Sequence, residues 1–313
     1  MILEKKFEDL ILNISSRAAL SSSYFVGKKD KIAADQAAVD TMRSELNKID
    51  MNGEIVIGEG ELDKAPMLYI GEKLGTTNGP YIDIAVDPLE GTNFAANNLP
   101  GALSVIAIAG KSNLFNAPET YMNKISADVK ENNVIDLDFS IKKNIYNLCE
   151  YKNKKPKDIT ACILDRPRHK KIIEELTKFD VHLKLISDGD VSGALLVTDV
   201  KYEVDLFLGI GGGPEGVLAA SALDSFNCFF QGKFLFETDV DKARAKKMGI
   251  KNFDKKYELN EIISGDSIFC ATGITSGDLV SGIKIVDSEF YSETLITHKS
   301  TGLKKIIKTK QKI

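Results

Sequence analysis

The amino-acid sequence predicts a layered α/β fold. Apolar residues recur every three or four positions in residues 4–23 and 31–49, which is the spacing of helices with one buried face. Short apolar runs typical of strands follow at residues 54–57, 82–86 and 103–109. Strand-like and helix-like segments then alternate, at residues 161–164, 170–178, 181–186, 204–208 and 216–223. Such alternation is typical of sheets covered by helices.

The segment Lys152–Lys157 is the best candidate for a domain boundary. It is polar and contains Pro156, as linkers between domains often do. A chain of 313 residues is long enough for one or two domains, each with a substantial core. We therefore expect two halves, residues 1–158 and 159–313.

Composition and charge exclude several classes of protein. The net charge of −4 argues against a nucleic-acid partner. No apolar run approaches the roughly 20 residues that span a bilayer, and early acidic residues argue against a signal peptide, so no membrane association is expected. The four cysteines lie far apart without a CxxC pair, which excludes a zinc knuckle and fits a reducing, cytoplasmic location.

The strongest chemical signal is the run Asp87-Pro88-Leu89-Glu90-Gly91-Thr92, which follows an apolar strand. The strand delivers Asp87, and Gly91 permits a tight turn. Asp87 and Glu90 can face one hard cation, because Mg²⁺ and Mn²⁺ prefer oxygen ligands. The hydroxyl of Thr92 can orient a water molecule.

Further acids lie in apolar or glycine-rich surroundings. Asp35 falls on the apolar stripe of its expected helix, between Ile32 and Val39, and an inward carboxylate needs a partner. Pairing with a basic residue is the alternative to a metal role. Glu59 and Glu61 follow an apolar strand on a glycine-flexed turn, for which an ordinary solvated turn is the alternative.

Glu215 follows the glycine run Gly209–Gly213, between an expected strand and an expected helix. Backbone N–H groups of such a run can bind an anion. A carboxylate beside a phosphate-sized nest makes sense if a cation lies between them.

Five acids are thus candidates for a shared site: Asp35, Glu59, Asp87, Glu90 and Glu215. They would repel one another if they were gathered without cations. Two divalent ions would remove that conflict and would suit the hydrolysis of a phosphate monoester, because they stabilise charge on phosphoryl oxygens. The residues alone do not establish that the five acids converge.

The run from Asp87 to Thr92 resembles the signature of the lithium-sensitive inositol monophosphatase and fructose-bisphosphatase superfamily. The wider sequence is similar to class II (GlpX-type) fructose-1,6-bisphosphatases, in the family order and over nearly the whole chain. The matching stretches are Ile55–Gly75, Asp83–Thr92, Asn116–Met122, Arg166–His169, Asp188–Asp190, Gly209–Gly216 and Ala271–Leu279.

The resemblance implies a role for each matching residue. The implied metal ligands are Asp35 and Glu59 for one ion, and Asp87, Glu90 and Glu215 for another. Thr92 is implied to position the attacking water, with support from Lys31, Glu61 and Asp63. The implied substrate contacts are Glu90, Gly91, Thr92, Tyr121, Arg166, Pro167, Arg168, Asp188, Gly189, Asp190 and Gly212.

The chemistry of the substrate set agrees with these roles. Arg166 and Arg168 offer bidentate forks for a remote phosphate, although an ordinary surface helix start is the alternative. Asp188 and Asp190 can accept hydrogen bonds from sugar hydroxyls. The histidines receive no catalytic assignment: His169 is expected near the sugar, and the expected places of His182 and His298 are the surface or strands.

The resemblance implies a layered αβαβα sandwich of the inositol monophosphatase/fructose-bisphosphatase kind. The first half would carry the metal site, and the second would add sugar contacts and Glu215. The implied activity is that of a phosphoric monoester hydrolase, which converts fructose 1,6-bisphosphate to fructose 6-phosphate and inorganic phosphate for gluconeogenesis, using Mn²⁺ or Mg²⁺. We expect a homo-oligomer, a dimer or a tetramer, and the sequence determines neither the state nor the ion.

Some residues depart from the family pattern. Asn93 stands where a basic residue is common, Arg166 stands where a lysine is common, and residues 237–249 form a short segment. No proposed metal ligand is lost, but the short segment leaves oligomeric contacts and any allosteric site open.

Three alternatives remain open. The same fold could act on sedoheptulose 1,7-bisphosphate or an inositol phosphate, although paired arginines favour a bisphosphate. Gly211, Gly213 and Gly216 fit the dinucleotide pattern GxGxxG, which is weak when it stands alone. A non-catalytic regulator would have no evident need for the intact acid set.

Overall fold

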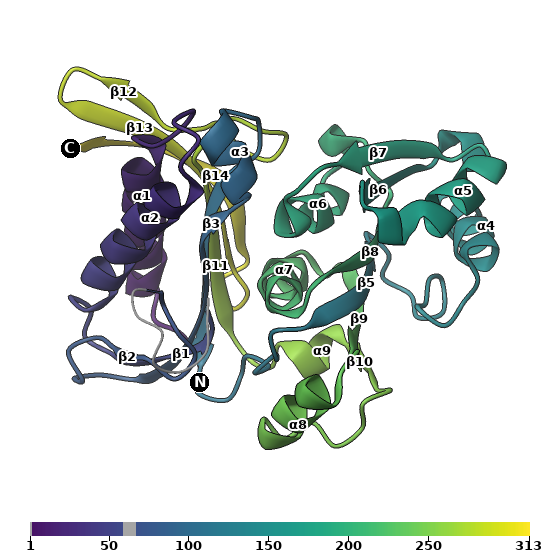
Figure 1. Cartoon of the computed structure of the whole chain (residues 1–313), viewed down its shortest axis with the longest axis horizontal. Coiled ribbons are helices and arrows are strands. Elements are labelled where there is room, and N and C mark those ends of the chain that lie inside the picture. Colours follow the sequence, from purple (N-terminus) through teal and green to yellow (C-terminus); the bar gives the residue numbers. More distant parts are fainter. Residues whose placement is uncertain (1, 59–66) are drawn as a thin grey trace. The chain divides into compact units, whose positions relative to one another are not determined.

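The computed structural model describes residues 2–58 and 67–313, which form two compact units (Figure 1). Unit 1 comprises Met1–Asn116 and Ile263–Ile313, and unit 2 comprises Ala117–Ile262. The expected boundary between residues 158 and 159 is therefore corrected. The C-terminal segment returns to unit 1 because β11 (Ser267–Gly273) pairs with β4 (Leu103–Gly110).

Unit 1 is built on a mixed sheet. Among the described residues it has eight strands in the order β12-β13-β11-β4-β3-β1-β2, with β14 beside β13. The remaining strands are β1 (Asn52–Ile57), β2 (Lys73–Leu74), β3 (Tyr81–Glu90), β12 (Lys284–Val286), β13 (Glu289–His298) and β14 (Leu303–Lys312). β1 and β3 run parallel, so their carboxyl ends lie at the same edge of the sheet.

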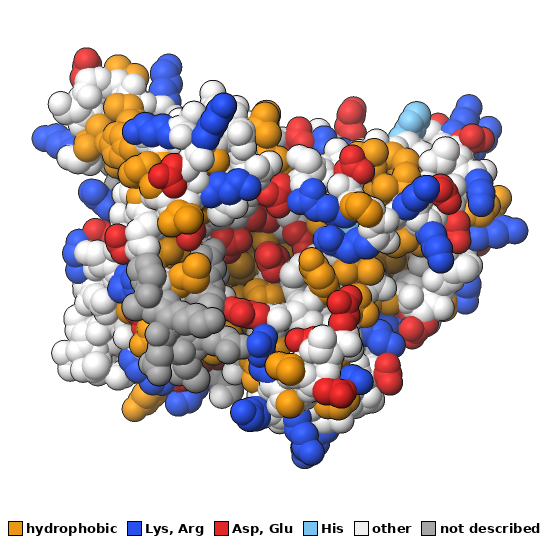
Figure 2. Space-filling model, viewed as in Figure 1, with side chains coloured by type: hydrophobic (Ala, Val, Ile, Leu, Met, Phe, Trp, Pro, Cys, Tyr) orange, Lys and Arg blue, Asp and Glu red, His pale blue; other side chains and the backbone are white. Residues whose placement is uncertain are grey.

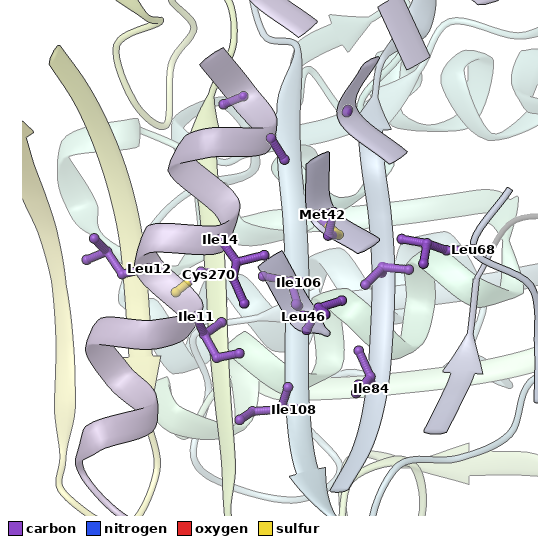
Figure 3. Packing of buried hydrophobic residues seen from close by; sticks show 14 of the residues in the cluster. Ile11, Leu12, Ile14, Met42, Leu46, Leu68, Ile84, Ile106, Ile108 and Cys270 are labelled. Carbon is purple, nitrogen blue, oxygen red and sulfur yellow. The ribbon is translucent and has the colours of Figure 1, made fainter. Parts of the chain in front are cut away.

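Two long helices, α1 (Lys6–Ser23) and α2 (Lys31–Leu46), cover one face of the unit 1 sheet (Figure 1). Figure 3 shows the apolar side chains between these helices and the strands, including Ile11 from α1, Met42 from α2 and Ile106 from β4. Each of these side chains is fully buried, and burial of one such group contributes about 1.5–3 kcal/mol. A short helix, α3 (Thr92–Asn97), follows β3.

The buried stripe of α2 differs from the expected one. Ile32 is 82% exposed, and Asp35 is only half-buried. Val39, Met42 and Leu46 are buried as expected, and the helix also buries Ala34 and Ala38, because small alanine side chains allow a close approach to the neighbouring helix and strands. Asp35 therefore lies beside the buried face of α2.

Unit 2 is built on a second mixed sheet. Among the described residues its six strands are ordered β10-β9-β5-β8-β6-β7. They are β5 (Tyr121–Ala127), β6 (Thr160–Leu164), β7 (His182–Ile186), β8 (Leu206–Gly212), β9 (Phe229–Leu235) and β10 (Lys256–Glu258). β6 runs parallel to both β7 and β8, whereas β5 runs antiparallel to β8 and β9.

Helices cover both faces of the unit 2 sheet (Figure 1). α4 (Ile141–Lys152) and α5 (Lys170–Lys178) lie on one face, and α6 (Asp190–Leu195) and α7 (Gly213–Phe226) lie on the other. Two further helices are α8 (Asp239–Lys247) and α9 (Leu259–Ile262). The candidate linker at residues 152–157 is the end of α4 and the turn after it, and so lies inside unit 2.

The α/β class expected from the sequence is confirmed. Unit 1 contributes one helical layer and one sheet, and unit 2 contributes one sheet between two helical layers. Sheets and helical layers of these kinds are what the resemblance implies.

A buried polar cluster joins distant segments of unit 1. His298, at the end of β13, is a strand residue but is fully buried, so the alternative of a surface position is wrong. Its Nδ1 lies 2.6 Å from Glu8 Oε1, and its Nε2 lies 3.1 Å from Asp266 Oδ2. Burial alone would raise the pKa of Asp266, but hydrogen bonds from Leu3, Ser300 and His298 outweigh it, and the pKa is lowered.

The surface agrees with the mild net charge. Basic and acidic side chains are interspersed over most of the face drawn in Figure 2. Within the described part of the chain, no helix combines the length and the apolar character that crossing a bilayer requires.

Candidate active site

The substrate contacts implied for unit 2 gather at one edge of its sheet. Since β6, β7 and β8 run in the same direction, their carboxyl ends meet at that edge, where ligands bind in open α/β sheets. These strands lead into Arg166–Arg168, Asp188–Asp190 and Gly212 respectively. β5 runs the opposite way, so its first residue, Tyr121, pairs with Gly212 at the same edge.

The two arginines are held in defined positions at this edge. The Arg168 guanidinium lies 4.8 Å from the centroid of the Tyr121 ring, and its Nε donates a 2.9 Å hydrogen bond to the carbonyl of Ile210. Nη2 of Arg166 lies 4.0 Å from Oδ1 of Asp188. A guanidinium that is fixed by stacking and hydrogen bonding loses less entropy when it binds an anion.

His169 is a buried residue that helps to hold Arg168 in place. It is fully buried in the turn Pro167–His169, where Nδ1 donates to the Leu164 carbonyl (2.6 Å) and Nε2 accepts the N–H of Ile210 (2.7 Å). Burial lowers the pKa of His169, which keeps the ring neutral and in this tautomer. The histidine thus ties the turn that carries Arg168 to strand β8.

The glycine run does not form the expected anion-binding loop. Gly209–Gly212 belong to strand β8, which passes directly into α7. The N–H of Ile210 bonds to His169, and the N–H of Gly213 bonds to the carbonyl of Thr120 (2.8 Å). These two donors are already used, and a strand that passes directly into a helix does not form the glycine-rich loop that a dinucleotide needs.

The glycines instead make room for two carboxylates. A Cβ at Gly211 would lie 2.0 Å from Oδ2 of Asp190, and a Cβ at Gly212 would lie 1.8 Å from Oε2 of Glu215. No side chain fits at either position without displacing these acids. Asp190 and Glu215 are therefore packed against the backbone of β8.

Lys124 is a charged residue of this edge that the sequence reasoning missed. It lies on β5, is 1% exposed, contacts the carboxylate of Asp190 and donates to the carbonyl of Gly212 (2.7 Å). Burial raises the pKa of Glu215, and the ammonium of Lys124 opposes that effect. The available signal in the sequence was a lysine in a short run that also contains the apolar residues Met122 and Ile125.

Tyr121, Gly212 and Glu215 line one cavity of about 430 Å³ in unit 2. Acidic residues that the sequence analysis did not assign to the site also line it, namely Glu119, Glu237 and Asp241. The cavity is large enough for a small sugar phosphate.

In unit 1 a bulge places the two acids of the Asp87–Thr92 motif on one face of the sheet. Asp87 pairs with Val105 and Glu90 pairs with Leu103, with a shift of register between them. In a regular strand, residues three apart project to opposite faces. The bulge inserts one residue, so both carboxylates project from the same face, and Glu90 is 4% exposed.

Gly91 and Thr92 begin the helix after this bulge. Gly91 has φ of +78°, a left-handed conformation that glycine adopts without strain, and a Cβ there would lie 2.8 Å from the Phe94 ring. Thr92 is the first residue of α3 and is half-buried.

The remaining predicted residues of the first half fall into two groups. Lys31 is the exposed first residue of α2, which places Asp35 one turn further along the helix. Glu59, Glu61 and Asp63 lie outside the described residues. Within residues 2–58 and 67–313, no three His, Cys, Asp or Glu side chains are grouped as ligands for a metal ion, so the ligand set stays a prediction.

Comparison with known proteins identifies the family. The model of the bacterial, glpX-encoded fructose-1,6-bisphosphatases matches residues 6–311. A curated relative from Trichodesmium erythraeum (strain IMS101), named D-fructose 1,6-bisphosphatase class 2/sedoheptulose 1,7-bisphosphatase, is 36% identical over 96% of this chain and 94% of its own. A relative of the same name from Prochlorococcus marinus (strain MIT 9515) is 40% identical over 88% of this chain and 86% of its own.

The fold and the family model together define a phosphoric monoester hydrolase. The chain belongs to the glpX-encoded fructose-1,6-bisphosphatase family, which confirms the resemblance seen in its motifs. The comparison with solved structures also found more distant proteins. The inositol monophosphatase of Anabaena (Nostoc) sp. PCC 7120 is 11% identical, with 62% of this chain and 71% of that chain covered, and the TM-score is 0.33.

Proposed function

We propose that this enzyme hydrolyses the 1-phosphate of fructose 1,6-bisphosphate. Water attacks phosphorus, the bond to the sugar oxygen breaks, and the products are fructose 6-phosphate and inorganic phosphate. The observation that carries the proposal is the edge of the unit 2 sheet, where two oriented arginines lie beside two aspartates. Relatives that are named as fructose 1,6-bisphosphatases support it.

The unit 2 edge would bind the sugar and the phosphate that stays on it. Arg166 and Arg168 would contact the remote phosphate, because a guanidinium fork matches phosphate oxygens. Asp188 and Asp190 would accept hydrogen bonds from sugar hydroxyls. The neighbouring residues of the proposed contact surface are Tyr121, Pro167, Gly189 and Gly212.

The reacting phosphate would lie beside Glu90, Gly91 and Thr92. The Thr92 hydroxyl would orient the attacking water, and Lys31, Glu61 and Asp63 would support it. Orientation of this kind lowers the barrier, because the water and the phosphorus are then held close to their reacting geometry.

We also propose a dependence on Mn²⁺ or Mg²⁺. The donor set fits hard cations, because it consists of carboxylates alone. Asp35 and Glu59 would hold one ion, and Asp87, Glu90 and Glu215 would hold the other. When bound, the ions would stabilise negative charge on the phosphoryl oxygens. The bulge that places Asp87 and Glu90 on one face supports this assignment.

The direct test is phosphate release from fructose 1,6-bisphosphate by the purified protein. We expect release with Mn²⁺ or Mg²⁺ and none with EDTA. Comparison of the two ions names the preferred one. Absence of release with every ion would overturn the proposal.

Sedoheptulose 1,7-bisphosphate is a second candidate substrate, because the names of the curated relatives include it. The same assay compares kcat/KM for the two bisphosphates and for an inositol phosphate. A preference for the inositol phosphate would show that the remote phosphate is not required.

Replacement of Arg168 by methionine should weaken bisphosphate binding specifically. A lost charge-assisted hydrogen bond is worth about 1.5–3 kcal/mol, so KM for fructose 1,6-bisphosphate should rise about 10- to 100-fold. KM for fructose 1-phosphate, which lacks the second phosphate, should change little. Lys171→Met, an exposed residue of the neighbouring helix α5, is the matched control and should alter neither value. An equal rise for both substrates would contradict the role of Arg168.

The product would feed gluconeogenesis in the cytoplasm, where four buried thiols are compatible with a reducing environment. A homo-oligomer, dimer or tetramer, is part of the same proposal, and light scattering of the purified protein tests it.

A further inference from the structure

Lys124 is an unusual residue for its place in the fold. It lies in the interior strand β5, between β8 and β9, and only 1% of its surface is exposed. A buried ammonium is costly unless it is paired and hydrogen-bonded. Lys124 meets both conditions, through the Asp190 carboxylate and through the Gly212 carbonyl at 2.7 Å.

The two oxygens of Asp190 are in different situations. Oδ2 contacts Lys124 and lies against Gly211, where no Cβ could fit. Oδ1 is also buried, and no described residue donates a hydrogen bond to it. A buried carboxylate oxygen without a donor is unfavourable, so this atom is suited to a hydrogen-bond donor that arrives with a ligand.

The partners of Lys124 belong to the substrate edge. Asp190 follows β7 and begins α6, and Gly212 ends β8 opposite Tyr121. The ammonium therefore connects the loop that carries Asp188–Asp190 to the strand end that carries Gly212. These are the segments assigned above to the sugar.

We propose that Lys124 is a positioning residue for substrate, which holds the carboxylate of Asp190 oriented so that its Oδ1 accepts a hydrogen bond from a sugar hydroxyl. This inference rests on the proposed function. Lys124 does not touch the substrate in this arrangement and acts on the sugar through Asp190. Gly211 contributes to the same arrangement, because its missing side chain leaves the space that the Asp190 carboxylate occupies.

The first test replaces Lys124 by methionine, which keeps most of the side-chain volume and removes the charge. Asp190 then lacks its cation, and the loss of one charge-assisted hydrogen bond to the sugar should raise KM for fructose 1,6-bisphosphate about 10- to 100-fold. The effect on kcat should be smaller, because the reacting phosphate is not involved. An unchanged KM in the folded variant would overturn the inference.

The matched control is Lys256→Met in the same unit. Lys256, on strand β10, also makes a partly buried ion pair. Its Nζ lies 2.6 Å from Asp136 Oδ1 and 2.7 Å from Asp138 Oδ2. This variant should lose stability but keep the wild-type KM. A rise in KM as large as that of Lys124→Met would show that general loosening of unit 2 explains both results, and would overturn the inference.

A double variant keeps the inference testable even if the Lys124→Met protein does not fold. Lys124→Met with Asp190→Asn removes both charges together, which avoids an uncompensated buried carboxylate. Because Lys124 acts through Asp190, the double variant should have the same KM as Asp190→Asn alone. A further tenfold rise in the double variant would overturn the inference. Inactivity of the wild-type protein would instead count against the proposed function, so the two failures are distinguishable.

Discussion

Replacement of Glu90 by glutamine should lower kcat for phosphate release by about a thousandfold. Glu90 is buried at the end of β3, on the same face as Asp87, and glutamine has nearly the same shape. The variant should therefore fold, but it lacks the negative charge with which a carboxylate stabilises a bound divalent ion. A loss of about 4 kcal/mol of transition-state stabilisation corresponds to this factor.

Asp83→Asn is the matched control for this prediction. Asp83 is a buried carboxylate of the same strand, and its Oδ2 accepts a hydrogen bond from the N–H of Asn113 (3.1 Å). Burial raises the pKa of Asp83, and hydrogen bonds from the N–H groups of Asn113 and Leu114 oppose that effect, so its carboxylate serves the turn after β4. Its variant should keep the wild-type kcat. Undiminished turnover of Glu90→Gln at saturating metal would refute the role of Glu90.

Replacement of His298 by leucine should destabilise the protein by about 3–5 kcal/mol, because it removes the partner of two buried carboxylates. Glu8 and Asp266 are 8% and 5% exposed, and both lie within hydrogen-bond distance of the imidazole. Without the imidazole these two acids repel each other in a low-dielectric environment. The cluster connects α1, β13 and the residue before β11, so unit 1 should unfold first.

Thermal unfolding measures this effect. A loss of 3–5 kcal/mol should lower Tm by about 10 °C in a domain of this size. His182→Leu, a histidine on the exposed strand β7, should shift Tm by no more than a degree or two, since exposed substitutions rarely change stability by more than about 0.5 kcal/mol. Equal Tm values for the two variants would show that the buried cluster does not stabilise unit 1.

Much of the local structure could be predicted because it depends on neighbouring residues. The helix expected at residues 170–178 has those bounds in the structure, and the strand expected at 161–164 is β6 with one residue added. The helix follows from the periodicity of its apolar side chains, and the strand follows from a short continuous apolar run. Strand β5 was missed, because Asn123, Lys124 and Ser126 interrupt the apolar residues of Tyr121–Ala127 and leave no long apolar run.

The unit boundaries and the glycine run could not be predicted from local pattern. Strand β11 belongs to unit 1 only because it pairs with β4, more than 150 residues earlier in the chain. The glycines of β8 fit a loop motif equally well, and their true role depends on Asp190 and Glu215, which pack against them. Contacts of this kind arise from tertiary packing and leave no periodic signal.

Short stretches of residue types carry the acidic motif, the paired arginines and the match to the family, so these features can be found without a structure. Tertiary structure alone decided which atoms meet. The bulge in β3 turns Asp87 and Glu90 to one face, and Lys124 reaches Asp190 across 66 residues of chain. Register and long-range pairing depend on the free energy of the whole packed sheet, which no single segment contains.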